Sequence, residues 1–182
     1  MDVASSDLIR EIETMYSTMT DEEYLRLCKS RLSLPSQFYG ILDPGECQVT
    51  EIFADEVWPS IRWDFDFNKV NHGDTIFSFS TKLCISKLMP VFYIEHQFQV
   101  EVKTTFLHEP TLDGCSNQPY SKRQVDLHSR LSEVLKKSGY KEINFAEASS
   151  VICSLSMPVN RIFGDQVTVE YALFHDVKDL CP

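Results

Sequence analysis

Asp64 and Asp66 are the residues whose types and spacing best fit chemistry, since aromatic residues alternate with them through residues 62–67. Side chains two apart in a strand point to the same face, about 7 Å from each other. Two carboxylates at that spacing can hold a divalent cation or divide acid and base roles. The same pattern describes the solvent face of an amphipathic strand, which is the commoner case, or a contact patch for a basic partner.

Histidines and cysteines give weaker signals. His96 falls on the apolar side of its predicted strand, where it is either a general base or ligand with a shifted pKa or, more commonly, a hydrogen-bonded core residue. His108-Glu109 begins like a zinc-protease motif, but no second histidine follows four residues later. The six cysteines are widely spaced and form no C-x-x-C pair. We therefore predict no catalytic residue, cofactor or metal site, and we lean against an enzyme.

The stretch from residue 43 to residue 66 is strongly acidic, with seven acidic residues and one basic residue, a net charge of 1 − 7 = −6. It also contains Trp58 and Trp63, on either side of Pro59. Aromatic anchors beside carboxylates are typical of an interface for a basic protein. Alternatively, Trp63 belongs to the core and Trp58 fills a loop. The predicted partner-binding residues are Asp55, Glu56, Trp58, Asp64 and Asp66.

The whole chain is acidic, since 17 basic and 27 acidic residues give a net charge of −10. This charge repels nucleic acids and anionic membranes, so we expect neither as a partner. It attracts a basic protein and accelerates the encounter. A length of 182 residues predicts a single domain over residues 1–182. The N-terminal residues lack a signal-peptide pattern, so we expect a cytoplasmic location with reduced, mostly buried cysteines.

Hydrophobic periodicity predicts helices near both ends of the chain. Leu8, Ile12 and Tyr16 recur at helical spacing. A capping box at residues 20–23 begins a second helix that ends before Pro35. A second box, at residues 121–124, begins a helix that ends near residue 139, and a short helix is expected over residues 173–180.

Alternating apolar and polar residues predict strands between these helices. The clearest runs span residues 62–67, 75–86 and 91–104. Weaker runs span 48–53, 151–156 and 167–171, and a polar loop is expected at 110–119. Short turns between consecutive runs indicate a β-meander with one wet face. We therefore predict an α+β fold: a mainly antiparallel β-meander sheet, with helices from the N-terminus and the C-terminal half packed on one face.

Three functions are compatible with these features. The first is a non-enzymatic protein-binding domain that neutralises a basic toxin or enzyme, by analogy of size and charge with the immunity proteins of bacterial toxin systems. The second is a small-ligand-binding or hydrolytic enzyme domain with a pocket inside the curved sheet, near His96. The third is a subunit of a larger complex, buried through residues 171–181. The oligomeric state stays open.

Overall fold

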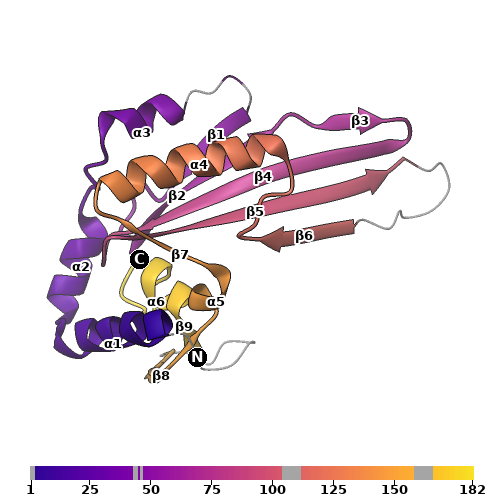
Figure 1. Ribbon diagram of the computed structural model, residues 1–182. Helices are drawn as coiled ribbons and strands as arrows, with labels where there is room; N and C mark the ends of the chain where they lie inside the picture. Colours follow the sequence, from indigo (N-terminus) through magenta and orange to yellow (C-terminus); the bar gives the residue numbers. More distant parts are fainter. Residues whose placement is uncertain (1–2, 43–44, 46, 104–111, 158–165) are drawn as a thin grey trace.

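Five antiparallel strands lie side by side in one sheet, in the order in which they occur in the chain (Figure 1). This arrangement confirms the predicted α+β fold and its meander. The computed structural model describes residues 3–42, 45, 47–103, 112–157 and 166–182. The five strands are β1 (Cys47–Ile52), β2 (Ser60–Phe67), β4 (Thr75–Ser86), β5 (Val91–Val102) and β6 (Leu112–Ser116). Two short strands complete the sheet: β3 (Val70–His72) pairs with β4 beyond the end of β2, and β7 (Lys141–Ile143) runs parallel to the start of β5.

The helices and a small second sheet flank this meander. The helices are α1 (Val3–Thr18), α2 (Asp21–Lys29), α3 (Ser36–Ile41), α4 (Lys122–Lys137), α5 (Phe145–Ala148) and α6 (Val169–Phe174), and the second sheet pairs β8 (Val151–Ser156) with β9 (Gln166–Thr168). Both predicted capping boxes are present, at the starts of α2 and α4. Within the described ranges, no helix is long and apolar enough to cross a membrane.

The helices divide between the two faces of the sheet, whereas the sequence predicts them on one. Helices α3 and α4 pack on a core that contains Phe92 and Ile94, and α1 and α6 pack on a second core that contains Val91 and Tyr93. Neighbouring residues of a strand point to opposite faces, so these four consecutive buried residues place a core on each side. A continuous apolar run of this kind is typical of a strand that is covered on both faces.

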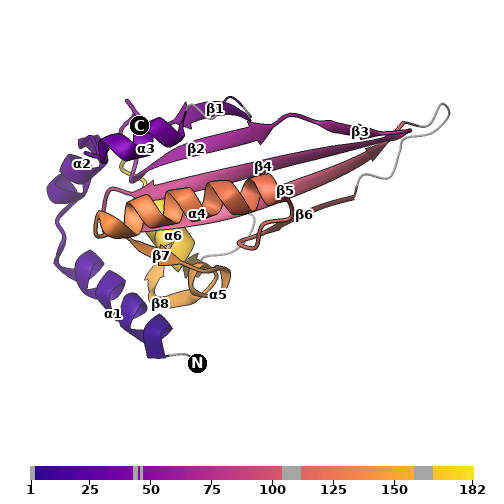
Figure 2. The same cartoon turned by 45° about the horizontal axis from the view of Figure 1, so that its top comes forward.

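The sheet continues past both helix layers at the end formed by β3, β6 and the adjoining parts of β4 and β5 (Figures 1 and 2). Burial decreases along β4 accordingly: Leu83 and Ile85 are fully buried, whereas residues 75–80 are only partly buried. We call this uncovered part the sheet extension. Within the described part of the chain, the helices leave most of both faces of this extension uncovered.

Several local predictions differ from the structure because tertiary contacts and caps decide them. The strand expected over residues 167–171 ends at Thr168, whose side chain caps α6 by accepting a hydrogen bond from the Tyr171 amide. Helix α2 ends at Lys29, and the separate helix α3 follows it. Strand β6 lies in the predicted polar loop and is held in the sheet by pairing with β5.

Gly114 of β6 lies against an aromatic ring, so its substitution tests this pairing. A Cβ atom at position 114 would lie 2.6 Å from Cε1 of Phe98, whose ring packs on Tyr120 at 4.6 Å between centroids. We expect Gly114→Ala to lower the free energy of unfolding by about 1–3 kcal/mol, because the ring must leave its packed position. Urea denaturation measures the change.

Gly40 of α3 supplies the matched control, since a Cβ atom added there would meet no other atom within 4 Å. Gly40→Ala should raise stability by about 0.5–1 kcal/mol through helix propensity. An equal response of the two variants would contradict the close approach at Gly114.

Candidate binding face

One face of the sheet carries polar side chains in rows that run across the strands. Strand pairing aligns Asp66, Ser80, Gln97 and Cys115 in one row, and Ser78, Gln99 and Asp113 in the next. A third row, closer to the helices, holds Asp64, Lys82 and Glu95. We call these ten residues the polar face. It lies opposite the face that α4 covers, because its residues alternate with those of the α4 core.

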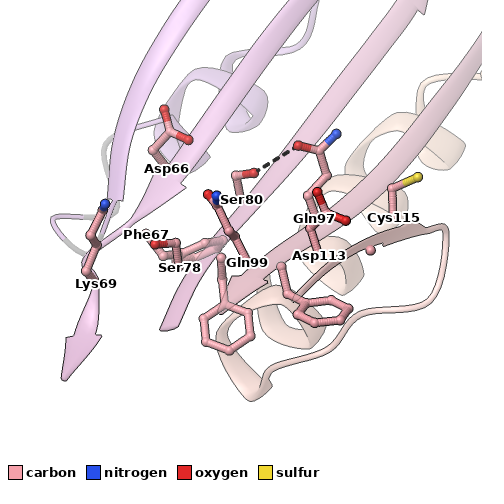
Figure 3. Close-up of a pocket in the computed structure, with 12 residues that line it drawn as sticks. Asp66, Phe67, Lys69, Ser78, Ser80, Gln97, Gln99, Asp113 and Cys115 are labelled. Carbon is pink, nitrogen blue, oxygen red and sulfur yellow. Dashed lines mark hydrogen bonds between the residues drawn. The ribbon is translucent and has the colours of Figure 1, made fainter. Parts of the chain in front are cut away.

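The polar face is hollowed in the sheet extension. A pocket of about 560 Å³ lies over it, lined by both outer rows and by Lys69, and also by Gly114 and the aromatic residues Phe67, Phe79 and Phe98 (Figure 3). The side chains of Asp66, Ser80, Gln97 and Cys115 point to the same side of the sheet in this view. The hollow therefore presents carboxylate, hydroxyl and amide groups together.

Charge is compensated near the helices and left uncompensated farther out. Arg62 Nη2 lies 2.9 Å from Asp64 Oδ2, and Lys82 Nζ lies 3.5 Å from Glu95 Oε1. Lys69 pairs with Glu101 at 3.9 Å on the rim. Neither Asp66 nor Asp113 forms an ion pair with a described residue. The outer part of the hollow is therefore negatively charged.

The five predicted partner-binding residues do not form one surface. Asp64 and Asp66 belong to the polar face, but Asp55 and Glu56 lie in the loop before β2. Asp66 is six strand residues from Ser60 at the start of β2, roughly 20 Å at the usual rise of a strand. Asp55 pairs instead with Arg31 at 2.7 Å, in an ion pair whose side chains are both more than 80% exposed, at 84% and 81%. Asp43 and Glu46 of the acidic stretch lie outside the described residues.

Trp58 and Trp63 both have structural roles, which is the alternative interpretation of the sequence. Trp63 is 1% exposed and packs against Phe38, with 5.0 Å between ring centroids. Trp58 is partly buried, stacks on Phe53 at 4.9 Å and donates a hydrogen bond from Nε1 to the carbonyl oxygen of Phe174 at 3.1 Å. Trp58 thus joins the loop before β2 to α6.

A smaller cleft lies at the inner end of the polar face, where α6 meets the sheet. We call it the α6 cleft; its volume is about 140 Å³, and it is lined by Arg62, Lys82, Tyr93, Glu95, Glu170 and Phe174, among others. Burial, followed by repulsion from Glu95, raises the pKa of Glu170. Sequence reasoning missed Glu170, because no motif links a residue of α6 to side chains of β2, β4 and β5.

His96 forms part of a hydrogen-bonded chain beneath α4. Its Nδ1 lies 2.9 Å from Thr81 Oγ1, and its Nε2 lies 2.9 Å from Nδ1 of His128. The Nε2 atom of His128 lies 2.9 Å from Glu142 Oε1. Lys136 and Ser132 each bond the other oxygen of Glu142, both at 2.7 Å. Thr81 and His96 are fully buried.

Charge and tautomer are coupled along this chain. Burial alone raises the pKa of Glu142, but hydrogen bonds from His128, Lys136 and Ser132 outweigh it and lower the pKa to about 2. The ionised carboxylate accepts only, so Nε2 of His128 carries a proton. When His128 is neutral, its Nδ1 therefore accepts from Nε2 of His96, whose own Nδ1 accepts from the Thr81 hydroxyl.

His96 is a core residue rather than an exposed base. Burial, followed by repulsion from His128, lowers its pKa to about 4, so the ring is neutral at physiological pH. Both of its hydrogen bonds go to side chains, those of Thr81 and His128. His96 does not line the hollow of the polar face. His108 and Glu109 lie outside the described residues.

The cysteines are more exposed than predicted. Cys28 is buried, but Cys115 and Cys153 are exposed on strands β6 and β8. Burial raises the pKa of Cys84 to about 12 and also raises that of Cys28, so these two thiols stay protonated. Within the described ranges, no group of three or more histidine, cysteine or acidic residues is placed to hold a metal ion.

Comparison with models of protein families, with curated proteins and with solved structures finds no match. The proposed function therefore rests on the geometry and charge of the polar face.

Proposed function

We propose that this domain is a protein-binding module that holds a basic segment of another protein on the polar face of its sheet. The observation that carries the proposal is the pair of uncompensated carboxylates, Asp66 and Asp113, in one hollow outside the helix layers. The net charge of −10 favours a basic partner over the whole molecule. Neutralisation of a basic toxin or enzyme, as immunity proteins achieve it, is the biological role we propose, in a cytoplasmic setting.

The character of the hollow supports a macromolecular partner over a small ligand. A volume of about 560 Å³ is within the range of small-molecule sites, but such sites are lined mainly by apolar and aromatic side chains. Phe67, Phe79 and Phe98 also line the hollow, but their positions alternate with those of the polar rows, so the charged and amide groups dominate the face that a partner would meet. A polar, open, acidic surface favours electrostatic steering and many exchangeable hydrogen bonds.

Paired charge reversal tests the proposal. Asp66→Lys with Asp113→Lys places two cations in the hollow, and Asp55→Lys with Glu56→Lys places two in the distant loop. Each pair changes the net charge equally, from −10 to −10 + 4 = −6. Wild type and both variants are immobilised, and mass spectrometry quantifies the basic proteins that each retains from the native source. The retained protein is then purified, and its binding is measured at low and at physiological salt.

We expect the Asp66→Lys, Asp113→Lys variant (the face variant) to weaken binding about tenfold to a hundredfold. The Asp55→Lys, Glu56→Lys variant (the loop variant) should leave binding nearly unchanged, because physiological salt screens charges that lie far from the partner. The association rate of the wild type should fall as salt rises. Equal weakening by both variants would mean that only net charge matters. Unchanged binding by the face variant would place the partner elsewhere, which is the result expected of a complex subunit bound through residues 171–181.

A further inference from the structure

Two cysteines from distant parts of the chain meet where the segment after α6 packs on α2. Cys28 belongs to α2, and Cys181 lies in the segment over residues 175–182. Both are free thiols; Cys28 is fully buried, and Cys181 is partly buried. Their side chains are hydrogen-bonded to each other. Because the sulfur atoms are already in contact, a bond between them requires adjustment of two side chains and not a new fold.

One buried carboxylate holds Cys181 in this position. The chain turns at residues 177–179, and Asp176 lies just before the turn. Its Oδ2 atom accepts a hydrogen bond from the amide of Cys181 at 2.6 Å, and its Oδ1 atom accepts one from the hydroxyl of Tyr24 at 3.0 Å. Tyr24 and Cys28 are four residues apart in α2, so they lie on the same face of the helix. Asp176 therefore places Cys181 beside Cys28.

A second anchor fixes the turn on the same face of α2. The Nζ atom of Lys178 lies 2.8 Å from Oδ1 of Asp21 and 3.1 Å from the carbonyl oxygen of Met19. It also lies 5.6 Å from the centre of the Tyr24 ring. Asp21, Tyr24 and Cys28 recur at the spacing of one helical face. The segment is thus docked along α2, and the two thiols are held against each other.

Burial keeps both thiols protonated at neutral pH. It raises the pKa of Cys28 and that of Cys181. Lys87, which is 6% exposed, donates from Nζ to the carbonyl oxygen of Cys28 at 2.8 Å. Its charge lowers the pKa of Cys28, but burial outweighs this effect and the charge of Asp176 opposes it. The thiolate is the reactive form, so the pair should react slowly at neutral pH and faster as the pH rises.

We infer that Cys28 and Cys181 form a reversible disulfide on exposure to hydrogen peroxide, and that this bond clamps the segment over residues 175–182 to α2. Disulfides in a reducing compartment are usually transient ones of this kind. The inference is independent of the proposed function, since neither cysteine lines the hollow of the polar face.

The reaction takes two steps. The thiolate of Cys181, the less buried residue, attacks one peroxide oxygen; the O–O bond breaks, and the departing hydroxide takes up the thiol proton as water. The thiolate of Cys28 then attacks the sulfur of this sulfenic acid; the S–O bond breaks, and the hydroxide leaves with the Cys28 proton as a second water. The two thiols lose two electrons and two protons, and the peroxide gains both. A dithiol reductant reverses the change.

The direct test uses protein with Cys115→Ser and Cys153→Ser, which removes the two exposed thiols. It is treated with limiting hydrogen peroxide, blocked with N-ethylmaleimide and digested without reduction. We expect a monomer that has lost the mass of two hydrogen atoms and a cross-linked peptide pair containing Cys28 and Cys181, both reversed by dithiothreitol. Oxygen addition at Cys181 without the cross-link would overturn the inference, as would cross-links that involve other cysteines to the same extent.

Stability tests the clamp itself. In the same background, the oxidised protein should unfold at a urea concentration about 1–2 M higher than the reduced protein, because the bond closes most of the chain into one loop and restricts the unfolded state. Cys181→Ser should remove this shift, and Cys47→Ser, at a partly buried position in β1, should retain it. An equal or lower midpoint after cross-linking would overturn the clamp. Peptide mapping needs neither of these two variants, so it tests the disulfide even if Cys181→Ser does not fold.

Discussion

At neutral pH, Glu142→Gln is expected to lower the free energy of unfolding by about 2–3 kcal/mol, because it removes the charge that His128, Lys136 and Ser132 all stabilise. The pKa of Glu142 falls from 4.5 to about 2 on folding, so its contribution is complete above pH 4.5 and is lost as pH falls through about 2. The difference between variant and wild type should therefore shrink across that window. Urea denaturation at a series of pH values measures it.

Glu133→Gln is the matched control on the same helix. Glu133 pairs with Lys137 at 2.6 Å, but both side chains are mostly exposed. Solvent and salt screen such a pair, so the variant should be indistinguishable from wild type in this assay. A Glu142→Gln variant that matches wild type at neutral pH, or one whose deficit is undiminished in acid, would contradict the coupling of Glu142 to its three donors.

A second pH dependence is expected from His96, in a window above that of Glu142. Burial and the neighbouring His128 lower the pKa of His96 from 6.5 to about 4, so the folded state resists its protonation while the unfolded state does not. Its contribution is complete above pH 6.5 and is lost as pH falls toward 4. The loss should amount to roughly 2–4 kcal/mol, since one pKa unit corresponds to about 1.4 kcal/mol.

His96→Gln isolates this contribution, because glutamine can still accept and donate hydrogen bonds but does not titrate. The variant should show a flatter dependence of unfolding free energy on pH between 6.5 and 4 than the wild type does. His72→Gln, at an exposed position in β3, should retain the wild-type slope. The same slope in His96→Gln as in wild type would show that other groups carry the pH dependence.

The chain of Thr81, His96, His128 and Glu142 illustrates how far sequence reasoning reaches into this molecule. Alternation places His96 on the apolar side of its strand, and the structure agrees. Its partners come from β4, α4 and β7, and no local spacing relates them. A histidine that is neutral because it is buried among such partners can be recognised only once the helix is docked on the sheet.

The candidate site could be predicted only in part, again because some of its residues come from segments that are distant in the sequence. The two-residue repeat of Asp64 and Asp66 correctly places both on one face, because a strand has a period of two. Proximity in sequence suggested that Asp55 and Glu56 share that surface, yet an extended strand carries them away from Asp66. Asp113 and Glu170 enter the site from β6 and α6, and only strand pairing and helix docking bring them there.

By itself, the sequence determined what depends on neighbouring residues: the two capping boxes, the long alternating strands, the acidic charge and the α+β class. These follow from local hydrogen bonds and from the periods of helix and strand. Only the tertiary structure decided that helices cover both faces, that the sheet outreaches them and that Glu170 lines one cleft with Arg62 and Lys82. Such features depend on contacts between distant segments, which compete for the same apolar surface and are settled only when the whole chain packs.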